Sequence, residues 1–129
     1  MDEQRRFFLA GAGTLAVLAA AGTLARNATI SAPGPYPFSL GVASGSPLPN
    51  SVILWTRILA DPLNAAATPP LAFAVRWEVA HDEAFTRIAA KGSASALPEL
   101  AHSVHVDATG LEPGRWYWYR FMLGDAVSP

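Results

Sequence analysis

Residues 71–80 read Leu-Ala-Phe-Ala-Val-Arg-Trp-Glu-Val-Ala, and they carry the clearest periodic pattern in the chain. Every second residue from position 73 is large and apolar, namely Phe73, Val75, Trp77 and Val79. Successive side chains of a β-strand point to opposite faces, so a period of two places these four on one face. The stretch therefore predicts a half-buried strand whose aromatic face lies in a hydrophobic core.

A second alternating stretch spans residues 115–123, Arg-Trp-Tyr-Trp-Tyr-Arg-Phe-Met-Leu. Tyr119 and Phe121 lie on the face that we assign to the core, while Trp116 and Trp118 lie on the opposite face. A strand with large apolar groups on both faces is poorly suited to an open sheet edge. We expect another part of the protein to cover its outer face.

Other short apolar runs are separated by turn residues. We expect strands over 38–44, 51–58, 85–92 and 102–108, with a turn over 45–50 and a proline-containing loop over 61–70. Short strands at this spacing are typical of a β-sandwich or barrel, and no helical period of 3.6 residues competes with them. The sequence predicts an all-β antiparallel sandwich over residues 38–129. Its expected core is built from Trp55, Phe73, Val75, Trp77, Val79, Tyr119 and Phe121.

The segment before the last strand reads Leu-x-Pro-Gly-x-x-Tyr, formed by Leu111, Pro113, Gly114 and Tyr117. This spacing resembles the tyrosine corner of immunoglobulin-like and fibronectin type III sandwiches. In that motif the tyrosine hydroxyl forms a hydrogen bond with backbone upstream while the ring packs in the core. The resemblance implies an immunoglobulin or fibronectin III-like sandwich.

The N-terminal segment differs in composition from the remainder. Its motif residues are Arg5, Arg6, Phe8 and Leu9, followed by an uncharged, alanine-rich stretch that ends near Ala25. This order resembles a twin-arginine signal, which implies recognition by the twin-arginine translocase and export to the periplasm or beyond. We expect a helical signal segment over 1–32 and a proline-rich linker over 33–37. The stretch is only mildly apolar, so we expect no stable membrane anchor, although a retained anchor or an amphipathic helix stays open.

Composition excludes several classes of function. Nine basic and ten acidic residues give a net charge of −1, so no positive electrostatic field attracts nucleic acid. The absence of cysteine excludes disulfides and thiolate metal sites.

Candidate site residues are also few. His102 and His105 are three residues apart, a spacing that directs them to opposite faces of a strand. Ser44 lacks the strand-to-helix turn of a nucleophile elbow. We expect neither a catalytic nor a metal site in the chain.

Four segments together resemble the N-terminal domain of the alkaline phosphatase D (PhoD) family. They are residues 38–47, 51–57, 77–80 and 117–121. The resemblance implies that the chain belongs to a secreted phosphomonoesterase or phosphodiesterase. It also implies that the metal ions of such an enzyme, iron and calcium, are bound by a larger metallophosphatase domain downstream. That domain would be the main partner of this chain, and we expect the chain to be an N-terminal fragment that is inactive alone.

A different class of function also fits the sequence. The aromatic side chains outside the expected core, chiefly Trp116 and Trp118, would suit a free-standing exported module that binds a glycan or a protein partner. Sandwich cores are themselves rich in aromatic residues, so this alternative depends on whether these two tryptophans are exposed.

Overall fold

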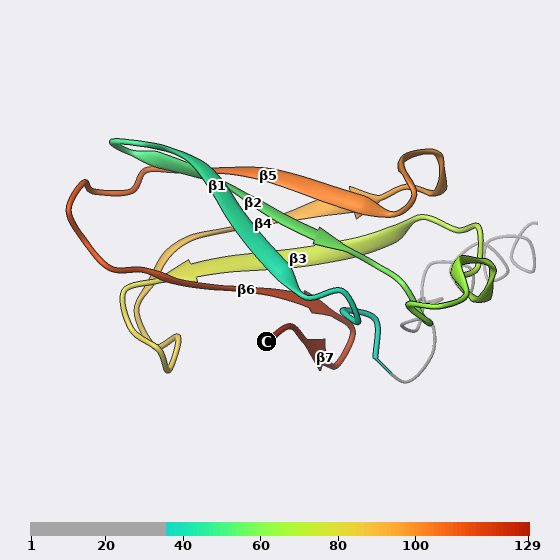
Figure 1. The fold of residues 1–129 in the computed structure, drawn as a ribbon. Coiled ribbons are helices and arrows are strands. Elements are labelled where there is room, and N and C mark those ends of the chain that lie inside the picture. The colour runs from blue at the N-terminus through green and yellow to red at the C-terminus, as the bar shows by residue number, and fades with distance from the viewer. Residues whose placement is uncertain (1–35) are drawn as a thin grey trace, which may run out of the picture.

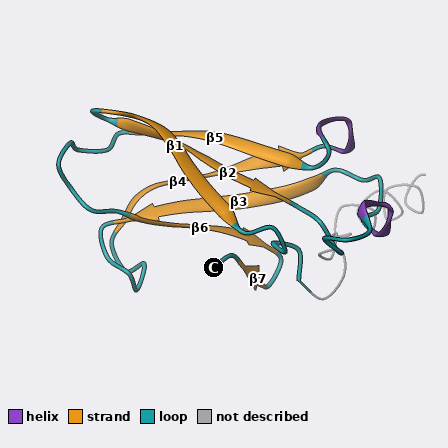
Figure 2. Cartoon of the chain, in the orientation of Figure 1, coloured by secondary structure: helices purple, strands orange, loops and turns teal. Residues whose placement is uncertain are grey.

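The computed structural model describes residues 36–129, and in this part of the chain the backbone forms seven strands in two sheets (Figure 1, Figure 2). The strands are β1 (Val42–Leu48), β2 (Ser51–Arg57), β3 (Phe73–Ala80), β4 (Ile88–Ala96), β5 (Ser103–Thr109), β6 (Trp118–Leu123) and β7 (Ala126–Val127). Single turns of 3-10 helix, Ala65–Ala67 and Pro98–Leu100, lie in two of the connections. The predicted signal segment and residues 33–35 of the predicted linker lie outside the described residues.

The two sheets contain three and four strands. Their orders are β1-β2-β5 and β4-β3-β6-β7, and each neighbouring pair is antiparallel. Figure 1 shows β5 in the upper layer of the molecule, with β3 and β6 in the lower layer. The prediction of an all-β antiparallel sandwich is confirmed. Within residues 36–129 there is no helix of the length and apolar character needed to span a membrane.

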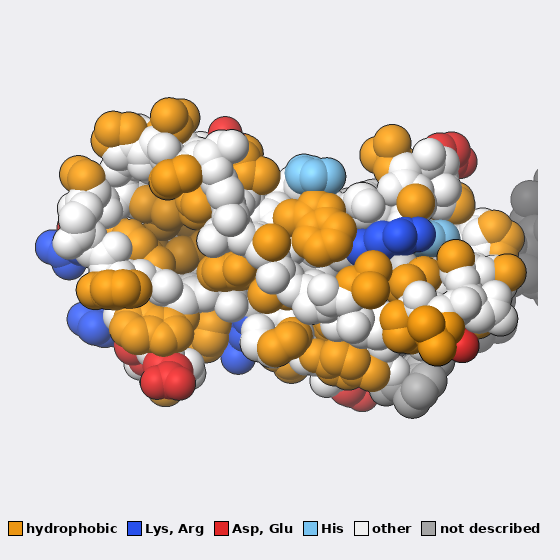
Figure 3. Space-filling model, in the orientation of Figure 1, with side chains coloured by type: hydrophobic (Ala, Val, Ile, Leu, Met, Phe, Trp, Pro, Cys, Tyr) orange, Lys and Arg blue, Asp and Glu red, His pale blue; other side chains and the backbone are white. Residues whose placement is uncertain are grey.

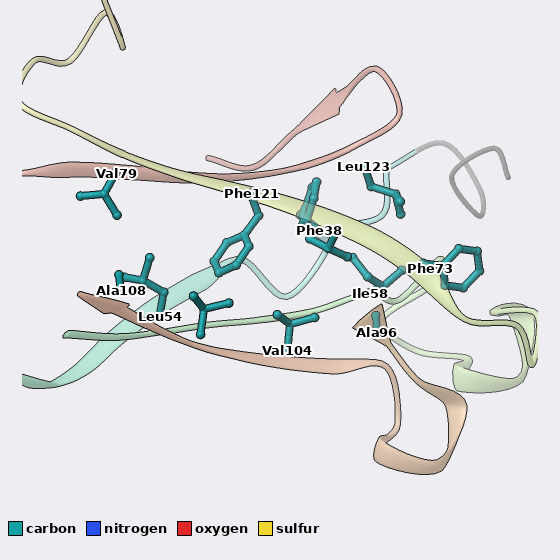
Figure 4. Close-up of a cluster of buried hydrophobic side chains, with 12 residues drawn as sticks. Phe38, Leu54, Ile58, Phe73, Val79, Ala96, Val104, Ala108, Phe121 and Leu123 are labelled. Atoms are coloured by element: carbon teal, nitrogen blue, oxygen red, sulfur yellow. The ribbon is translucent and has the colours of Figure 1, made fainter. Parts of the chain in front are cut away.

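The hydrophobic core lies between the two sheets (Figure 4). Leu54, Val104 and Ala108 from the three-stranded sheet face Val79 and Phe121 from the other sheet, and all five side chains are buried. The alternation along β3 explains this arrangement, because Phe73, Val75 and Val79 share its inner face. Trp77 follows the same parity but is only partly buried against the core.

One end of the sandwich is sealed, and we call it the closed end. It is defined by Phe38, Ile58, Phe73 and Ala96, each no more than 1% exposed. Two contacts of His102 close it further. The His102 carbonyl accepts a hydrogen bond from the Ile58 amide at 3.0 Å, and its Nε2 lies 2.8 Å from the Leu71 carbonyl oxygen.

The first strand differs from its predicted bounds. It begins at Val42 instead of Phe38, because Gly41 has a φ of 75° and its amide bonds the Phe38 carbonyl in a tight turn. Phe38 instead forms an isolated parallel bridge with Leu59. The strand then continues through the predicted turn to Leu48, with an irregularity in register between Gly45 and Leu48.

Four other expectations also need adjustment. Trp55 alternates with the buried Leu54 and Thr56, so it lies on the outer face of β2, half-buried beside His105, and does not belong to the core cluster. The last long strand begins at Trp118, later than predicted, because the residues before it form a loop. The strand predicted over 85–92 is displaced along the chain and lies at Ile88–Ala96. Residues 36 and 37, assigned to the linker, contact the sandwich: the Pro37 carbonyl accepts a hydrogen bond from Leu59.

Candidate functional site

A groove opens at the end of the sandwich opposite the closed end. It has a volume of about 580 Å³ and lies between the β1–β2 hairpin and the loop that connects β5 to β6. Figure 3 shows it at the left of the molecule as a hollow with hydrophobic side chains. We call this the open end and define it by Val52, Leu111, Tyr117 and Tyr119, which line the groove and are only partly buried.

Tyr117 fixes the loop that forms one wall of the groove. Its hydroxyl accepts a hydrogen bond from the backbone amide of Glu112 at 2.8 Å, five residues upstream. Gly114, with a φ of 70°, supplies the left-handed backbone that the turn requires. The Leu111 amide donates to the Asn50 carbonyl at 3.0 Å, which ties the loop to the β1–β2 hairpin. The loop is therefore held by one hydrogen bond to the Tyr117 side chain and one to the backbone of the facing hairpin.

The outer face of β6 divides into a paired part and an exposed part. Arg120 forms an ion pair with Glu78 at 2.7 Å, and its guanidinium carbon lies 4.2 Å from the centre of the Phe85 ring. Trp116 is 86% exposed and Trp118 is 38% exposed. The apolar surface that sequence analysis expected to be covered is thus concentrated next to the open end.

The two candidate histidines lie far from any shared site. His102 is buried at the closed end against the Phe73 ring, at a centroid distance of 5.3 Å. His105 is exposed on the outer face of β5, opposite Trp55. Across residues 36–129 no group of three or more histidine, aspartate or glutamate side chains could hold a metal ion. The iron and calcium that the family resemblance implies are expected in a domain downstream of these residues.

Two other polar positions have structural roles. Asp82 accepts hydrogen bonds from the Thr86 hydroxyl, the Thr86 amide and the Arg87 amide, which close the β3–β4 loop. These bonds, the Thr86 hydroxyl first, hold the pKa of the Asp82 carboxyl below its ordinary value of 3.8. Ser44 lies on β1, where a hairpin and not a helix follows, so the geometry of a nucleophile elbow is missing.

Sequence reasoning missed the groove itself. It placed Tyr119 among the core residues and did not identify Val52 or Leu111 as lining an opening. The signals that could have revealed it are Pro47, Pro49, Pro113 and Gly114, turn residues that belong to its two walls.

Comparisons with known proteins cover almost the whole chain. The sequence profile described as "PhoD-like phosphatase, N-terminal domain" matches residues 23–129. Alkaline phosphatase D of Bacillus subtilis (strain 168) is 51% identical over 131 residues, which include 97% of this chain and 22% of the relative. A solved structure of PhoD is 58% identical with a TM-score of 0.71, and the match covers 73% of this chain and 18% of that one. The chain therefore spans about a fifth of the length of the relatives it matches. With this sandwich and this match, the chain belongs to the PhoD-like phosphatase family and corresponds to its N-terminal domain.

Proposed function

We propose that the chain is the accessory N-terminal domain of an exported phosphatase that hydrolyses phosphate esters with a metal-dependent domain located downstream. The observation that carries this proposal is the combination of 51% identity across the chain with coverage of only 22% of alkaline phosphatase D. The remaining four-fifths of such a relative has room for a large catalytic domain.

The metal chemistry belongs to that downstream domain. A bound metal ion in such a domain would supply an activated oxygen nucleophile and stabilise the charge that develops on the phosphoryl group. Neither described candidate histidine is placed to join a shared site, since His102 is buried at the closed end and His105 lies on an outer face. The role of this domain is to support the fold of its partner or shield it.

The open end is the part of the surface best suited to contact the catalytic domain. Trp116, 86% exposed, lies beside the Glu112–Arg115 ion pair in the same loop. Exposed tryptophan and arginine side chains are enriched in protein interfaces, and burying a tryptophan removes a large apolar area from water. The rigid tyrosine corner presents these groups without a large loss of conformational entropy on docking.

Export by the twin-arginine route is the second element of the proposal. Its support is the Arg5, Arg6, Phe8 and Leu9 motif, which lies outside the described residues. Replacing both arginines by lysine in the full-length protein should abolish its appearance outside the cytoplasm. Undiminished export of that variant would contradict the twin-arginine assignment.

The activity is tested with the full-length protein, using a chromogenic phosphomonoester and a phosphodiester. We expect hydrolysis that is lost on metal chelation and restored by metal, and no hydrolysis by the 129-residue chain. Trp116→Ala should lower the thermal stability or the activity of the full-length protein, while Leu63→Ala, at a side chain that is 95% exposed near the closed end, should leave both unchanged. Hydrolysis by the 129-residue chain alone would overturn the proposal.

The exposure of Trp116 also favours one alternative, a free-standing module that binds a glycan through stacking on the indole ring. Titration of glycans against the tryptophan fluorescence of the chain distinguishes the two. A saturable shift that Trp116→Ala removes would support the binding module, and an unchanged spectrum would remove its motive.

A further inference from the structure

The outer face of the three-stranded sheet carries a tryptophan that belongs neither to the core nor to the open end. Trp55 is half-buried in the middle of β2, the central strand of that sheet, and points away from the four-stranded sheet (Figure 1). Trp116 is more exposed but belongs to a loop, whereas Trp55 lies between two paired strands. A side chain fixed on a rigid sheet loses little conformational entropy when a ligand binds, so Trp55 is the better prepared of the two.

Two polar side chains lie beside Trp55 on the neighbouring strand β5. The register places His105 directly opposite Trp55, with Asp107 two residues further along the same face, and both polar side chains are exposed. The Ile58 amide donates to the His102 carbonyl across this strand pair, so the even-numbered residues of β2 direct their amides toward β5. Trp55 and His105 therefore form a non-hydrogen-bonded pair, in which the Cα atoms are only about 4.5 Å apart and the side chains lie close together.

The other side of Trp55 is open, because β1 contributes only small residues there. Ala43 lies opposite Trp55 and Gly45 lies opposite Ile53, and both small residues are exposed. A Cβ atom on Gly45 would have no neighbour within 4 Å among the described residues. The face therefore has an apolar floor of Trp55 and Ile53, a polar wall on the β5 side and free space on the β1 side.

The charges around Trp55 are balanced. Arg57 and Asp107 are the only charged residues in the three described strands of this sheet. The Arg57 Nε donates to the Ala101 carbonyl at 2.8 Å, which uses only one of the donors of the guanidinium. Asp107 supplies acceptors, and the His105 ring supplies a donor and an acceptor. Such a face attracts neither a polyanion nor a polycation, and it suits hydroxyl groups, which both donate and accept.

The small size of the apolar floor decides which kind of partner fits. Two half-buried side chains are far too little for a stable protein interface, which needs roughly 800 Å² from each partner. A pyranose ring with equatorial hydroxyl groups has an apolar C–H face that matches one aromatic ring, and its hydroxyl groups lie around the rim.

We propose that this face, which we call the Trp55 platform, binds a neutral β-linked oligosaccharide. The platform consists of Trp55, Ile53, Arg57, His105 and Asp107. One pyranose ring stacks on the Trp55 indole, and its hydroxyl groups form hydrogen bonds with His105 and Asp107. The platform is separate from the open end, so this inference does not depend on the proposed function.

Calorimetric titration of the full-length protein with cellohexaose and with chitohexaose, two neutral β-linked oligosaccharides, tests the proposal. We expect saturable binding of at least one of them with a Kd of about 1 mM or below. Absence of saturable binding of both up to about 10 mM would overturn the proposal. Tighter binding of an oligogalacturonate, which carries a carboxylate on every ring, would contradict the balanced charge of the platform.

Substitutions on the platform locate the site. Trp55→Ala should weaken binding about ten-fold or more, and Asp107→Ala should weaken it about two- to ten-fold through a lost hydrogen bond. Trp116→Ala is the matched control and should leave the Kd unchanged within about two-fold. Binding that Trp116→Ala removes and Trp55→Ala keeps would place the saccharide at the open end and overturn the proposal.

A variant that fills the free space keeps the test independent of any loss of folding in Trp55→Ala. Gly45 lies diagonally across from Trp55 on the same face, so the long side chain of Gly45→Gln reaches the position of the bound ring. We expect this variant to unfold at the temperature of the original protein and to bind at least about ten-fold more weakly. Full affinity in Gly45→Gln would contradict the platform. Phosphatase activity is read separately, so an active enzyme that binds no saccharide would reject only this inference.

Discussion

The closed end and the open end of the sandwich contain similar residues in different surroundings. Phe38 and Phe73 at the closed end are each 1% exposed, whereas Tyr117 and Tyr119 at the open end are only partly buried. The closed end is covered by connections within the described residues, through His102 and the segment before β3. The open end has no such cover among residues 36–129. The difference shows that the described residues seal the domain at one end only, and it is the reason for proposing the open end as the contact with the rest of the protein.

The largest loss of stability should come from a substitution that leaves a cavity at the closed end. Phe73→Ala removes a buried ring and should cost about 3–5 kcal/mol of unfolding free energy, a large part of the roughly 5–15 kcal/mol of a typical domain. Urea unfolding of the chain measures the loss. Tyr119→Ala at the open end provides the comparison and should cost less in the same chain. If the two losses were equal, the distinction between the ends would fail.

A second test adds a methyl group where β4 packs against Trp77, between the closed end and the open end. A Cβ atom on Gly92 would lie 2.9 Å from the Trp77 indole ring, so Gly92→Ala should cost about 1–3 kcal/mol through overpacking. The matched control is Gly45→Ala, where the added Cβ has no neighbour within 4 Å. Thermal unfolding followed by circular dichroism compares them. A Gly92→Ala variant as stable as the control would show that Trp77 is not held against β4.

At the open end, the hydroxyl of Tyr117 supplies a smaller contribution. Tyr117→Phe removes the acceptor for the Glu112 amide and should cost about 0.5–1.5 kcal/mol. Tyr119→Phe is the control, because its hydroxyl makes no hydrogen bond within the described residues. Denaturant titration of both variants separates them. Equal stability of the two would mean that the hydrogen bond does not hold the loop.

The smallest expected effect is a change in the free energy of unfolding at acidic pH. The pKa of Asp82 is lower in the folded chain than its ordinary value of 3.8, so its hydrogen bonds stabilise the fold above that value, and the contribution is lost as pH falls through the folded pKa. The difference in unfolding free energy between the original chain and Asp82→Ala should be constant from about pH 7 to about pH 5 and shrink on further acidification. A difference independent of pH would contradict the role of the carboxylate.

The strands that carry alternating residues could be predicted from sequence. Phe73, Val75 and Val79 lie on one face because the period of two depends only on local geometry. The position of Trp55 could not be predicted in the same way, since both faces of β2 carry apolar residues and only the pairing decides which faces inward. The resemblance of Tyr117 to a tyrosine corner located the loop but not the opening beside it.

The groove depends on features that no local pattern contains. One of its walls is the β1–β2 hairpin, whose register is irregular between Gly45 and Leu48, and the other is the loop between β5 and β6. The two walls meet only in the folded chain, because the hairpin and the loop are far apart in the sequence. The start of β1 was missed for a related reason, since Gly41 adopts a positive φ within a stretch that reads as a continuous strand.

The most direct test of the account uses the absence of cysteine from the chain. Arg115→Cys places a thiol at the open end while keeping Trp116, at a side chain that is 59% exposed. Leu63→Cys places one near the closed end, at a side chain that is 95% exposed. We predict that a maleimide labels both thiols rapidly in the 129-residue chain, and that in the full-length protein only Leu63→Cys keeps its rate. Equal labelling of the two positions in the full-length protein would contradict the proposal that the open end meets the rest of the protein.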